Sequence, residues 1–189
     1  MRIAFAGASG TGKSTLAKFV AERYGLEQCP VGSRSVAVAM GFASPYDVDA
    51  AGKRAEFQRR LFVEKRAWEE AHESFVTDRT HLDNLAYATM HGCAESLTKE
   101  DLRAYSLAMG RYTNVFLCPV AAFQDLAGDP QRVASEAYHR LYDLVLSALF
   151  DALHRGPASR FECGGREERE VLLGFLLGET SPGAKTTAP

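Results

Sequence analysis

The chain has 189 residues, of which 46% are hydrophobic and 24% are charged. These values describe one globular domain with a sizeable buried core, and they exclude disordered and fibrous proteins. Lys and Arg number 22 against 24 Asp and Glu, which gives a formal net charge of −2. That balance argues against a strongly basic nucleic-acid-binding protein, although it leaves room for a local basic groove.

Neither the cysteines nor the apolar runs indicate a secreted or membrane protein. The four cysteines, Cys29, Cys93, Cys118 and Cys163, are widely spaced and form no CxxC pair, so no zinc site is expected. Free thiols suit a reducing compartment, which predicts a cytoplasmic protein. The longest apolar run, residues 171–178, is too short to span a membrane, and we expect neither a membrane partner nor a signal peptide.

The first quarter of the chain predicts a strand followed by two helices. The apolar run at residues 2–7 is typical of a buried parallel strand. Helical spacing of apolar residues follows over 13–25, where Gly25 provides a stop. A second short helix is expected over 33–40, and the Gly, Pro and Asp content of 41–52 predicts a loop.

The rest of the chain continues the alternation of helices and strands. A long helix is expected at 53–74, because its apolar residues recur on one stripe, and a strand at 75–78. Further helices are expected at 82–91, 98–109, 135–154 and 166–177. Two further strands are expected at 115–120 and 160–163, and a loop is expected at 122–132. Thr98 and Asp101 resemble a capping box at the start of the helix at 98–109. The last residues, 179–189, have the composition of a disordered tail.

Alternating strands and helices predict an α/β fold in which a parallel sheet is covered by helices on both faces. In such a sheet the functional site lies at the carboxyl ends of the strands. We expect a three-layer P-loop NTPase sandwich with a five-stranded parallel sheet and a short lid. Residues 1–178 would form this one domain, and 179–189 the tail.

The strongest signal is a phosphate-binding loop between the first strand and the first helix. The segment from Gly7 to Ser14 matches G-x-x-x-x-G-K-[ST] at every fixed position. Its glycines let successive backbone N–H groups face a phosphate, and the following helix adds its positive end. We expect Lys13 to reach the β- and γ-phosphates of ATP and Ser14 to ligate Mg²⁺. The predicted nucleotide-binding residues are Gly7, Ser9, Gly10, Thr11, Gly12, Lys13, Ser14 and Thr15.

A second candidate group stands at the end of the strand at 75–78. There Asp78 would lie next to the phosphate loop, where it could hold Mg²⁺ or take a proton from an acceptor hydroxyl. The adjacent Arg79 would point at a phosphate or a hydroxyl between the loop and the acceptor. The alternative is that Asp78 only caps the helix that begins near Leu82.

Two further groups of basic residues each have two interpretations, as functional residues or as ordinary solvated surface residues. A flexible loop after the fourth strand carries Asp129 and Arg132, and Arg132 is placed to close over the γ-phosphate and stabilise transition-state charge. Arg140, in the following helix, is a weaker candidate, and either arginine could be a solvated surface residue. The helix at 53–74 carries six basic residues, but its interspersed glutamates favour a solvated helix face over a nucleic-acid patch. Those six are Lys53, Arg54, Arg59, Arg60, Lys65 and Arg66.

At these motifs the chain resembles the nucleoside and nucleotide kinases of the P-loop class. GASGTGKSTLAKFVAE (7–22) and FVTDRTHLDNLAYA (75–88) carry the resemblance: thymidylate kinases have D-R-[YH] at this strand end, and deoxynucleoside kinases have E-R-S. Over residues 1 to 177 the chain is similar to a small AAA-type kinase-like family that includes nicotinamide-riboside kinase domains and phage proteins. The matching positions are Arg34, Phe57 and Gln58, Asp78 to Thr80, the lid Gly128–Arg132, and Glu167 to Arg169.

The chain departs from that family in two places. The lid, GDPQR, is longer than usual, and the segment after the second strand, PVGSRS (30–35), lacks the acidic residue that related kinases place there. Asp47 or Asp49 could supply the missing carboxylate, so the catalytic base is Asp78, Asp47 or Asp49.

The resemblance implies an ATP- and Mg²⁺-dependent kinase that acts on a hydroxyl or phosphate of a nucleoside, nucleotide or ribosyl compound. An alternative acceptor is a hydroxymethyl pyrimidine in DNA, which makes DNA a possible partner. A rival from another class is a nucleotide-dependent regulatory ATPase or switch. A switch needs no acceptor pocket, whereas a kinase needs one beside Asp78 and Arg79. The sequence leaves the acceptor, the choice of ATP or GTP, and the oligomeric state open.

Overall fold

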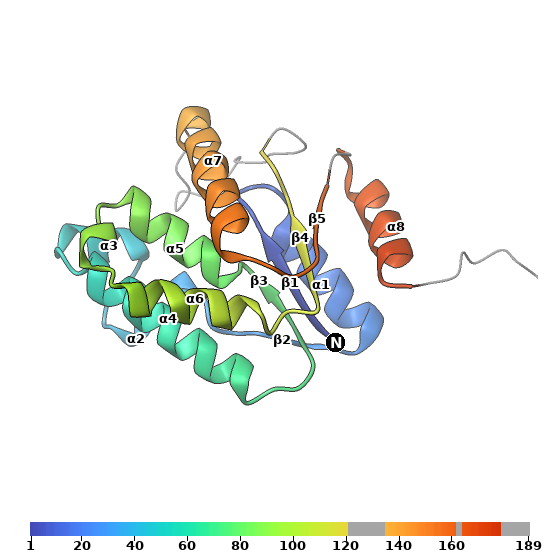
Figure 1. The fold of residues 1–189 in the computed structure, drawn as a ribbon, viewed down its shortest axis with the longest axis horizontal. Coiled ribbons are helices and arrows are strands. Elements are labelled where there is room, and N and C mark those ends of the chain that lie inside the picture. Colours follow the sequence, from blue (N-terminus) through green and yellow to red (C-terminus); the bar gives the residue numbers. More distant parts are fainter. Residues whose placement is uncertain (121–134, 162–163, 179–189) are drawn as a thin grey trace, which may run out of the picture.

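The computed structural model describes residues 1–120, 135–161 and 164–178. Its centre is a parallel sheet of five strands in the order β2-β3-β1-β4-β5 (Figure 1). The strands are β1 (Arg2–Ala6), β2 (Glu27–Gln28), β3 (Phe75–Asp78), β4 (Asn114–Leu117) and β5 (Ala158–Arg160). The predicted α/β fold with a five-stranded parallel sheet is therefore confirmed. The expected lid and the tail at 179–189 lie outside the described residues.

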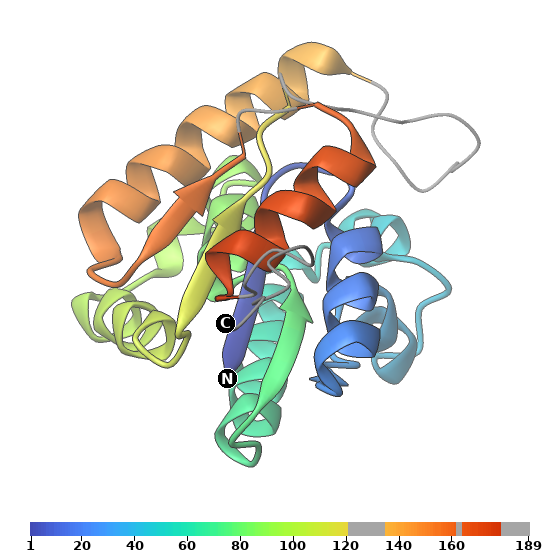
Figure 2. The same ribbon diagram turned by 90° about the vertical axis from the view of Figure 1, so that its right-hand side faces the viewer.

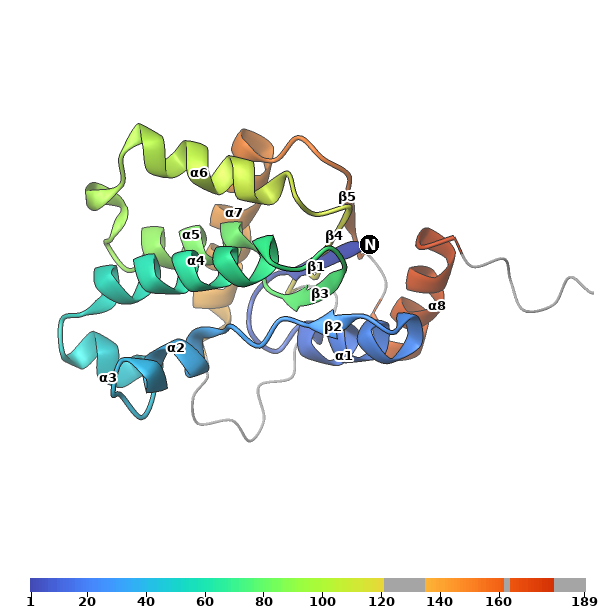
Figure 3. The same ribbon diagram turned by 90° about the horizontal axis from the view of Figure 1, so that it is seen from below.

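Helices cover both faces of the sheet. The α-helices are α1 (Lys13–Tyr24), α2 (Ser33–Ala39), α3 (Pro45–Ala50), α4 (Arg54–Glu70), α5 (His81–Met90), α6 (Lys99–Met109), α7 (Glu136–Leu153) and α8 (Arg166–Leu176), with a 3-10 turn at Ala94–Ser96. Helices α1 and α8 pack on one face (Figure 2), and α5, α6 and α7 pack on the other, with α4 beside α5 (Figure 3). Each face has its own apolar core, and a third core joins α2, α3 and α4.

The strand register brings the two predicted motifs together. β1 pairs in parallel with β3, so that Phe5 is opposite Asp78, and with β4, so that Ala6 is opposite Leu117. The P-loop follows β1 directly, and the Asp78 side chain stands at the C-terminal end of β3, the neighbouring strand in the sheet. The expectation that Asp78 ends a strand beside the first strand is confirmed.

The structure corrects four predicted elements. The strand expected at 115–120 runs from Asn114 to Leu117. Residues 41–52 are not entirely loop, because Ser44 caps α3 by accepting a hydrogen bond from the Asp47 amide and Pro45 occupies its first turn. The fifth strand begins at Ala158 rather than at residue 160, and buried Phe161 follows it. The long helix ends at Glu70 instead of residue 74; the sequence supplies no glycine or proline stop there.

Candidate functional site

The P-loop backbone depends on glycine at three of its positions. Gly7, Gly10 and Gly12 have φ angles of 141°, 77° and 84°, values that residues with a side chain rarely adopt. At Gly7 a Cβ atom would also lie 2.3 Å from the carbonyl oxygen of Cys118. The turn after β1 can therefore pass close to the end of β4 only because residue 7 has no side chain.

The loop borders an open cavity, which we call the P-loop cavity. It is lined by the predicted binding residues Ser9, Gly10, Gly12, Lys13, Ser14 and Thr15. Gly7 and Thr11 do not line it. The Gly7 amide donates to Asp83 Oδ1 at 3.0 Å, and the buried Thr11 hydroxyl donates to the Ala8 carbonyl at 2.9 Å, so both contribute to the loop's own structure.

Lys13 lies across the loop that it belongs to. Its ammonium group is buried, donates to the Ala8 carbonyl, and donates to Thr11 Oγ1 at 3.1 Å. Burial lowers the pKa of Lys13, and the nearby positive charge of Arg79 lowers it further. A phosphate at this position would offer the ammonium group an anionic partner in place of a carbonyl oxygen.

Ser14 and Asp78 meet at the edge of the P-loop cavity. The Ser14 hydroxyl donates to Asp78 Oδ2, while Oδ1 of Asp78 is buried without a hydrogen-bond partner among the described residues. A hydroxyl and a carboxylate with an unsatisfied oxygen fit the oxygen ligands that Mg²⁺ prefers. Asp78 is not the cap of the next helix: Thr80 caps α5 and accepts from the Asp83 amide.

Asp83 is a buried residue of the site that the sequence analysis missed. Its Oδ2 accepts from the backbone and hydroxyl of Thr80 at 2.8 and 2.7 Å, and its Oδ1 accepts from Gly7 and from the Tyr142 hydroxyl at 2.7 Å. One carboxylate thus ties the start of α5, the P-loop and α7 together. The T-x-x-D spacing from Thr80 to Asp83 signals a capping box, but its link to Gly7 has no signal in the sequence.

Arg79 is the only non-glycine residue with positive φ among the described residues, at 88°. This backbone turns its guanidinium group toward the P-loop, where it donates to the Gly7 carbonyl at 3.3 Å and to Ser9 Oγ at 3.2 Å. The same group lies 3.6 Å from Asp83 and over the ring of Tyr87. Strained backbone of this kind persists where the surroundings hold it, and it is common at functional sites.

A second cavity lies between α2, α3, α4, α5 and α7, and we call it the helical cavity. Its apolar wall includes Phe57, Leu61, Tyr46, Tyr87 and Tyr138. Asp78 and Arg79 line this cavity and the P-loop cavity alike. The two cavities therefore adjoin at the carboxyl end of β3, where Asp78 ends the strand and Arg79 follows it.

Two amide side chains stand in the wall of the helical cavity, and hydrogen bonds fix their orientation. Tyr105 donates its hydroxyl to Asn84 Oδ1, and Asn84 Nδ2 donates to Gln58 Oε1 at 2.6 Å. The Gln58 oxygen is therefore occupied, and its NH₂ group is left to donate. Gln58 was part of the resemblance, whereas Asn84 and Tyr105 were not singled out by any sequence signal.

The other candidate carboxylates are engaged away from the cavity. Asp49 forms an ion pair with Arg54, and Asp47 accepts a hydrogen bond from Ser44 Oγ at 2.9 Å. Neither carboxylate lines the helical cavity, whereas Arg54 does. The alternatives to Asp78 as the base thus have less favourable positions.

The predicted arginines are divided between the described and the undescribed parts of the chain. Arg132 and Asp129 lie outside the described residues. Arg140 is exposed and pairs with Glu136 within α7 at 2.7 Å. Arg169 was noted only as part of the resemblance. The structure buries it and places its Nη1 2.6 Å from the Thr11 carbonyl, so that it braces the P-loop from α8.

The expectation of a solvated basic face on α4 is wrong for two residues. The side chain of Arg54 is only 14% exposed, pairs with Asp49 and lines the helical cavity. Arg60 and Arg66 pair with Glu64 and Glu70 four residues on, and these side chains are exposed. Lys65 is buried instead, with 4% of its side chain exposed, and lines the helical cavity. Its position flanking the apolar stripe directs it inward.

Within the described part of the chain, no helix is both long and apolar enough to cross a membrane. A family model described as an AAA domain matches residues 2–169. No curated protein sequence matches the chain significantly.

The fold is similar to those of solved small-molecule kinases. Shikimate kinase from Aquifex aeolicus is 19% identical with a TM-score of 0.58, over 94% of this chain and 99% of that one. Deoxyadenosine kinase from M. mycoides, with dCMP and dCDP bound, is 14% identical with a TM-score of 0.63, over 94% and 98%. Shikimate kinase from Acinetobacter baumannii, in complex with shikimate, is 14% identical with a TM-score of 0.60, over 93% and 92%. The chain belongs to the AAA domain family and has the P-loop fold of these kinases.

Proposed function

We propose that the protein is an ATP- and Mg²⁺-dependent kinase that phosphorylates a hydroxyl or phosphate of a nucleoside, nucleotide or ribosyl compound. One observation carries the proposal: Asp78 and Arg79 line both the P-loop cavity and the helical cavity. An acceptor in the helical cavity would present its reacting oxygen at the residues that also face the γ-phosphate. Phosphoryl transfer depends mainly on such positioning.

Each predicted catalytic residue has a role in this arrangement. Lys13 and Arg79 would neutralise charge on the phosphates, and Ser14 and Asp78 would hold Mg²⁺. When bound, the ion would supply further charge neutralisation at the phosphate oxygens. The carboxylate of Asp78 would also accept the proton of an acceptor hydroxyl. Arg132 stays a proposal for closure over the γ-phosphate.

The lining of the helical cavity supports an acceptor with a planar, hydrogen-bonding part. Tyr46, Phe57 and Tyr87 offer aromatic surface, and the oriented amide of Gln58 offers two N–H donors. Aromatic surface combined with a few fixed polar groups is typical of small-molecule sites. The likeness to a deoxyadenosine kinase agrees with a nucleoside-type acceptor.

The rival functions receive less support. A regulatory switch needs no acceptor cavity, yet one adjoins Asp78. A DNA acceptor would be favoured by an unpaired basic surface, but Arg60 and Arg66 pair with glutamates on α4, and Lys53, which precedes the helix, pairs with Glu56. These exposed pairs reduce the local positive charge that would attract DNA.

The test is ADP formation from ATP and Mg²⁺, measured with and without candidate acceptors. The panel contains nucleosides, deoxynucleoside monophosphates, ribosyl compounds and DNA carrying hydroxymethyl pyrimidines. A kinase gives ADP and phosphorylated acceptor in equal amounts with one class of acceptor. ADP formation that no acceptor stimulates, with release of inorganic phosphate alone, would favour the ATPase or switch.

A further inference from the structure

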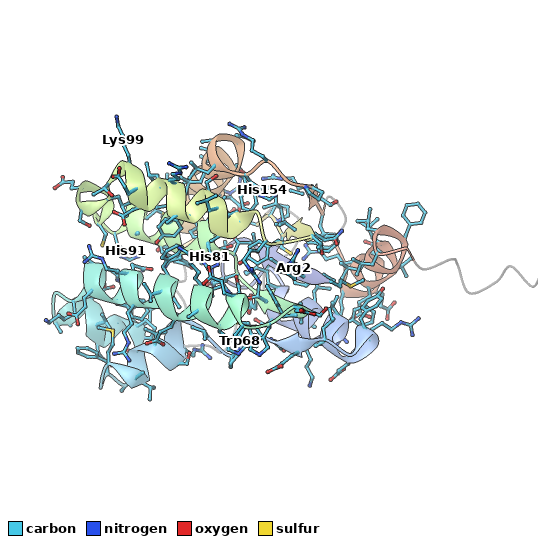
Figure 4. The ribbon with its side chains drawn as sticks, turned by 60° about the horizontal axis from the view of Figure 1, so that its bottom comes forward. Arg2, Trp68, His81, His91, Lys99 and His154 are labelled. Atoms are coloured by element: carbon cyan, nitrogen blue, oxygen red, sulfur yellow. The ribbon has the colours of Figure 1, made fainter. Side chains whose placement is uncertain are left out.

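Beneath the Asp78–Arg79 turn lies a buried ion pair that the proposed chemistry does not use. Lys65 Nζ is 3.0 Å from Glu69 Oε1, and the two side chains are 4% and 0% exposed. Glu69 also accepts from His81 Nε2 at 2.8 Å and from the Tyr112 hydroxyl at 3.0 Å. In Figure 4, His81 lies in the interior of the molecule, whereas Lys99 projects from its surface.

Both members of the pair are charged. Burial alone would raise the pKa of Glu69, but the Lys65 charge and the His81 hydrogen bond outweigh it and lower the pKa to about 2. Burial alone would lower the pKa of Lys65, and the charge of Glu69 reverses that effect, so that the pKa is raised. A buried ion pair is weak evidence for a stabilising role, because desolvation offsets much of the attraction. The contact of the pair with Thr77 in β3 offers another role.

The ammonium group of Lys65 reaches the strand that ends at Asp78. It donates to Thr77 Oγ1, and the Thr77 hydroxyl in turn donates to the Arg79 carbonyl at 3.3 Å. Because Lys65 supplies a proton to the Thr77 oxygen, the proton of that hydroxyl is free to point at the Arg79 carbonyl. The chain of contacts runs from α4 to the residue with positive φ that ends the turn.

We propose that Lys65, held by Glu69, is a positioning residue that acts through Thr77 to hold Asp78 and Arg79 in the conformation that faces the P-loop. The side chains of the turn contact Ser14, Gly7 and Ser9, and the Arg79 amide donates to the Phe5 carbonyl at 2.8 Å. The Thr77 hydroxyl adds a hydrogen bond to the backbone carbonyl of Arg79 itself. Without the Thr77 hydrogen bond, the backbone at Arg79 is able to relax from its φ of 88°. The Ser14–Asp78 contact and the Arg79–Ser9 contact then shift together.

A matched pair of variants tests this role. Thr77→Val keeps the shape and removes the hydroxyl, whereas Thr77→Ser keeps the hydroxyl. At a temperature where all proteins are folded, Thr77→Val is expected to lower kcat about tenfold or more. It should also lose most of the gain in ATP affinity that Mg²⁺ gives the wild type, measured by calorimetry. Thr77→Ser should restore both quantities.

A second set of variants removes the ion pair without leaving one charge buried. Lys65→Met/Glu69→Gln should reproduce the loss seen in Thr77→Val. The control is Arg66→Met/Glu70→Gln, which removes the exposed pair one residue further along α4 and should leave kcat and the Mg²⁺ effect unchanged.

The inference rests on the proposed function for its kcat readout, whereas the Mg²⁺-dependent affinity does not need an acceptor. If the wild type binds MgATP more tightly than ATP but phosphorylates nothing, the proposed function fails and the positioning role is still tested by affinity. A folded Thr77→Val protein with normal kcat and a normal Mg²⁺ effect would overturn the inference. A Thr77→Ser protein as impaired as Thr77→Val would overturn it as well, and so would a wild type whose ATP affinity Mg²⁺ does not raise.

Discussion

Replacing Asp78 by Asn separates a chemical role of this residue from a structural one. The substitution keeps the size of the side chain and removes its charge. Among the described residues, the Asp78 side chain accepts one hydrogen bond, from the Ser14 hydroxyl to Oδ2, and its Oδ1 is buried without a partner. The amide oxygen of Asn can still accept from Ser14. Since Thr80 rather than Asp78 caps α5, the helix keeps its cap.

These contacts determine how much Asp78→Asn should change the stability, the rate of phosphoryl transfer and the binding of ATP. At most one hydrogen bond weakens, so the free energy of unfolding should change by no more than about 1 kcal/mol, which moves Tm by about 2–4 °C in a chain of this size. Phosphoryl transfer should fall about a hundredfold or more, since the variant lacks both the base and an anionic Mg²⁺ ligand. Binding of ATP without Mg²⁺ should change little.

The assay combines thermal melting with the rate of ADP formation, and Asp83→Asn is the control. Asp83 accepts four hydrogen bonds, from Gly7, Tyr142 and the amide and hydroxyl of Thr80. Its amide variant should lose about 3 kcal/mol of stability because donors face the new NH₂ group. A stable and fully active Asp78→Asn protein would refute the reasoning and move the base to Asp47 or Asp49.

Three further predictions follow from the same geometry. Lys13→Ala should abolish transfer while melting stays close to wild type, and turnover by the folded variant would contradict the P-loop assignment. Gly7→Ala should cost about 2–4 kcal/mol in denaturant unfolding, because its Cβ would meet the Cys118 carbonyl at 2.3 Å; an unchanged midpoint would show that the turn adjusts freely. The pKa of Glu69, lowered from 4.5 to about 2, supplies stability that is present above pH 4.5 and lost as the pH falls toward 2. That contribution is about 3 kcal/mol. Because Glu69→Gln has no carboxylate to protonate at this position, its free energy of unfolding should fall less steeply below pH 4.5 than that of the wild type. An equally steep fall in the two proteins would contradict the lowered pKa.

The sequence predicted the parts of the fold and site that depend on local pattern. The P-loop motif, the strand that ends at Asp78 and the capping box of Thr98 and Asp101 each lie within a short stretch of the chain, and the structure has them where they were expected. The parallel sheet followed from the alternation of strands and helices. Helix α3 was missed because Gly41 and Pro45 suggested a loop, although Ser44 and Pro45 are also typical of a helix start.

The remaining features depend on contacts between residues far apart in the chain. Arg169 bonds to the Thr11 carbonyl across 158 positions, and Asp83 bonds to Gly7 across 76. Lys65 shares its helix with exposed basic residues, but it is buried where α4 packs against α5 and where its ammonium group reaches Thr77 of β3. The spacing of apolar residues predicts which face of a helix is buried. It does not reveal that a partner such as Glu69 allows a charged residue to lie in the interior.

The most direct test of the proposed function is ³¹P NMR of the reaction mixture with MgATP and the acceptor that most stimulates ADP formation. The proposed transfer at Asp78 and Arg79 predicts a new phosphate signal on the acceptor that grows as the γ-phosphate signal of ATP falls, and its absence with Asp78→Asn. Loss of the γ-phosphate signal to inorganic phosphate alone, at the same rate with and without the acceptor, would contradict it.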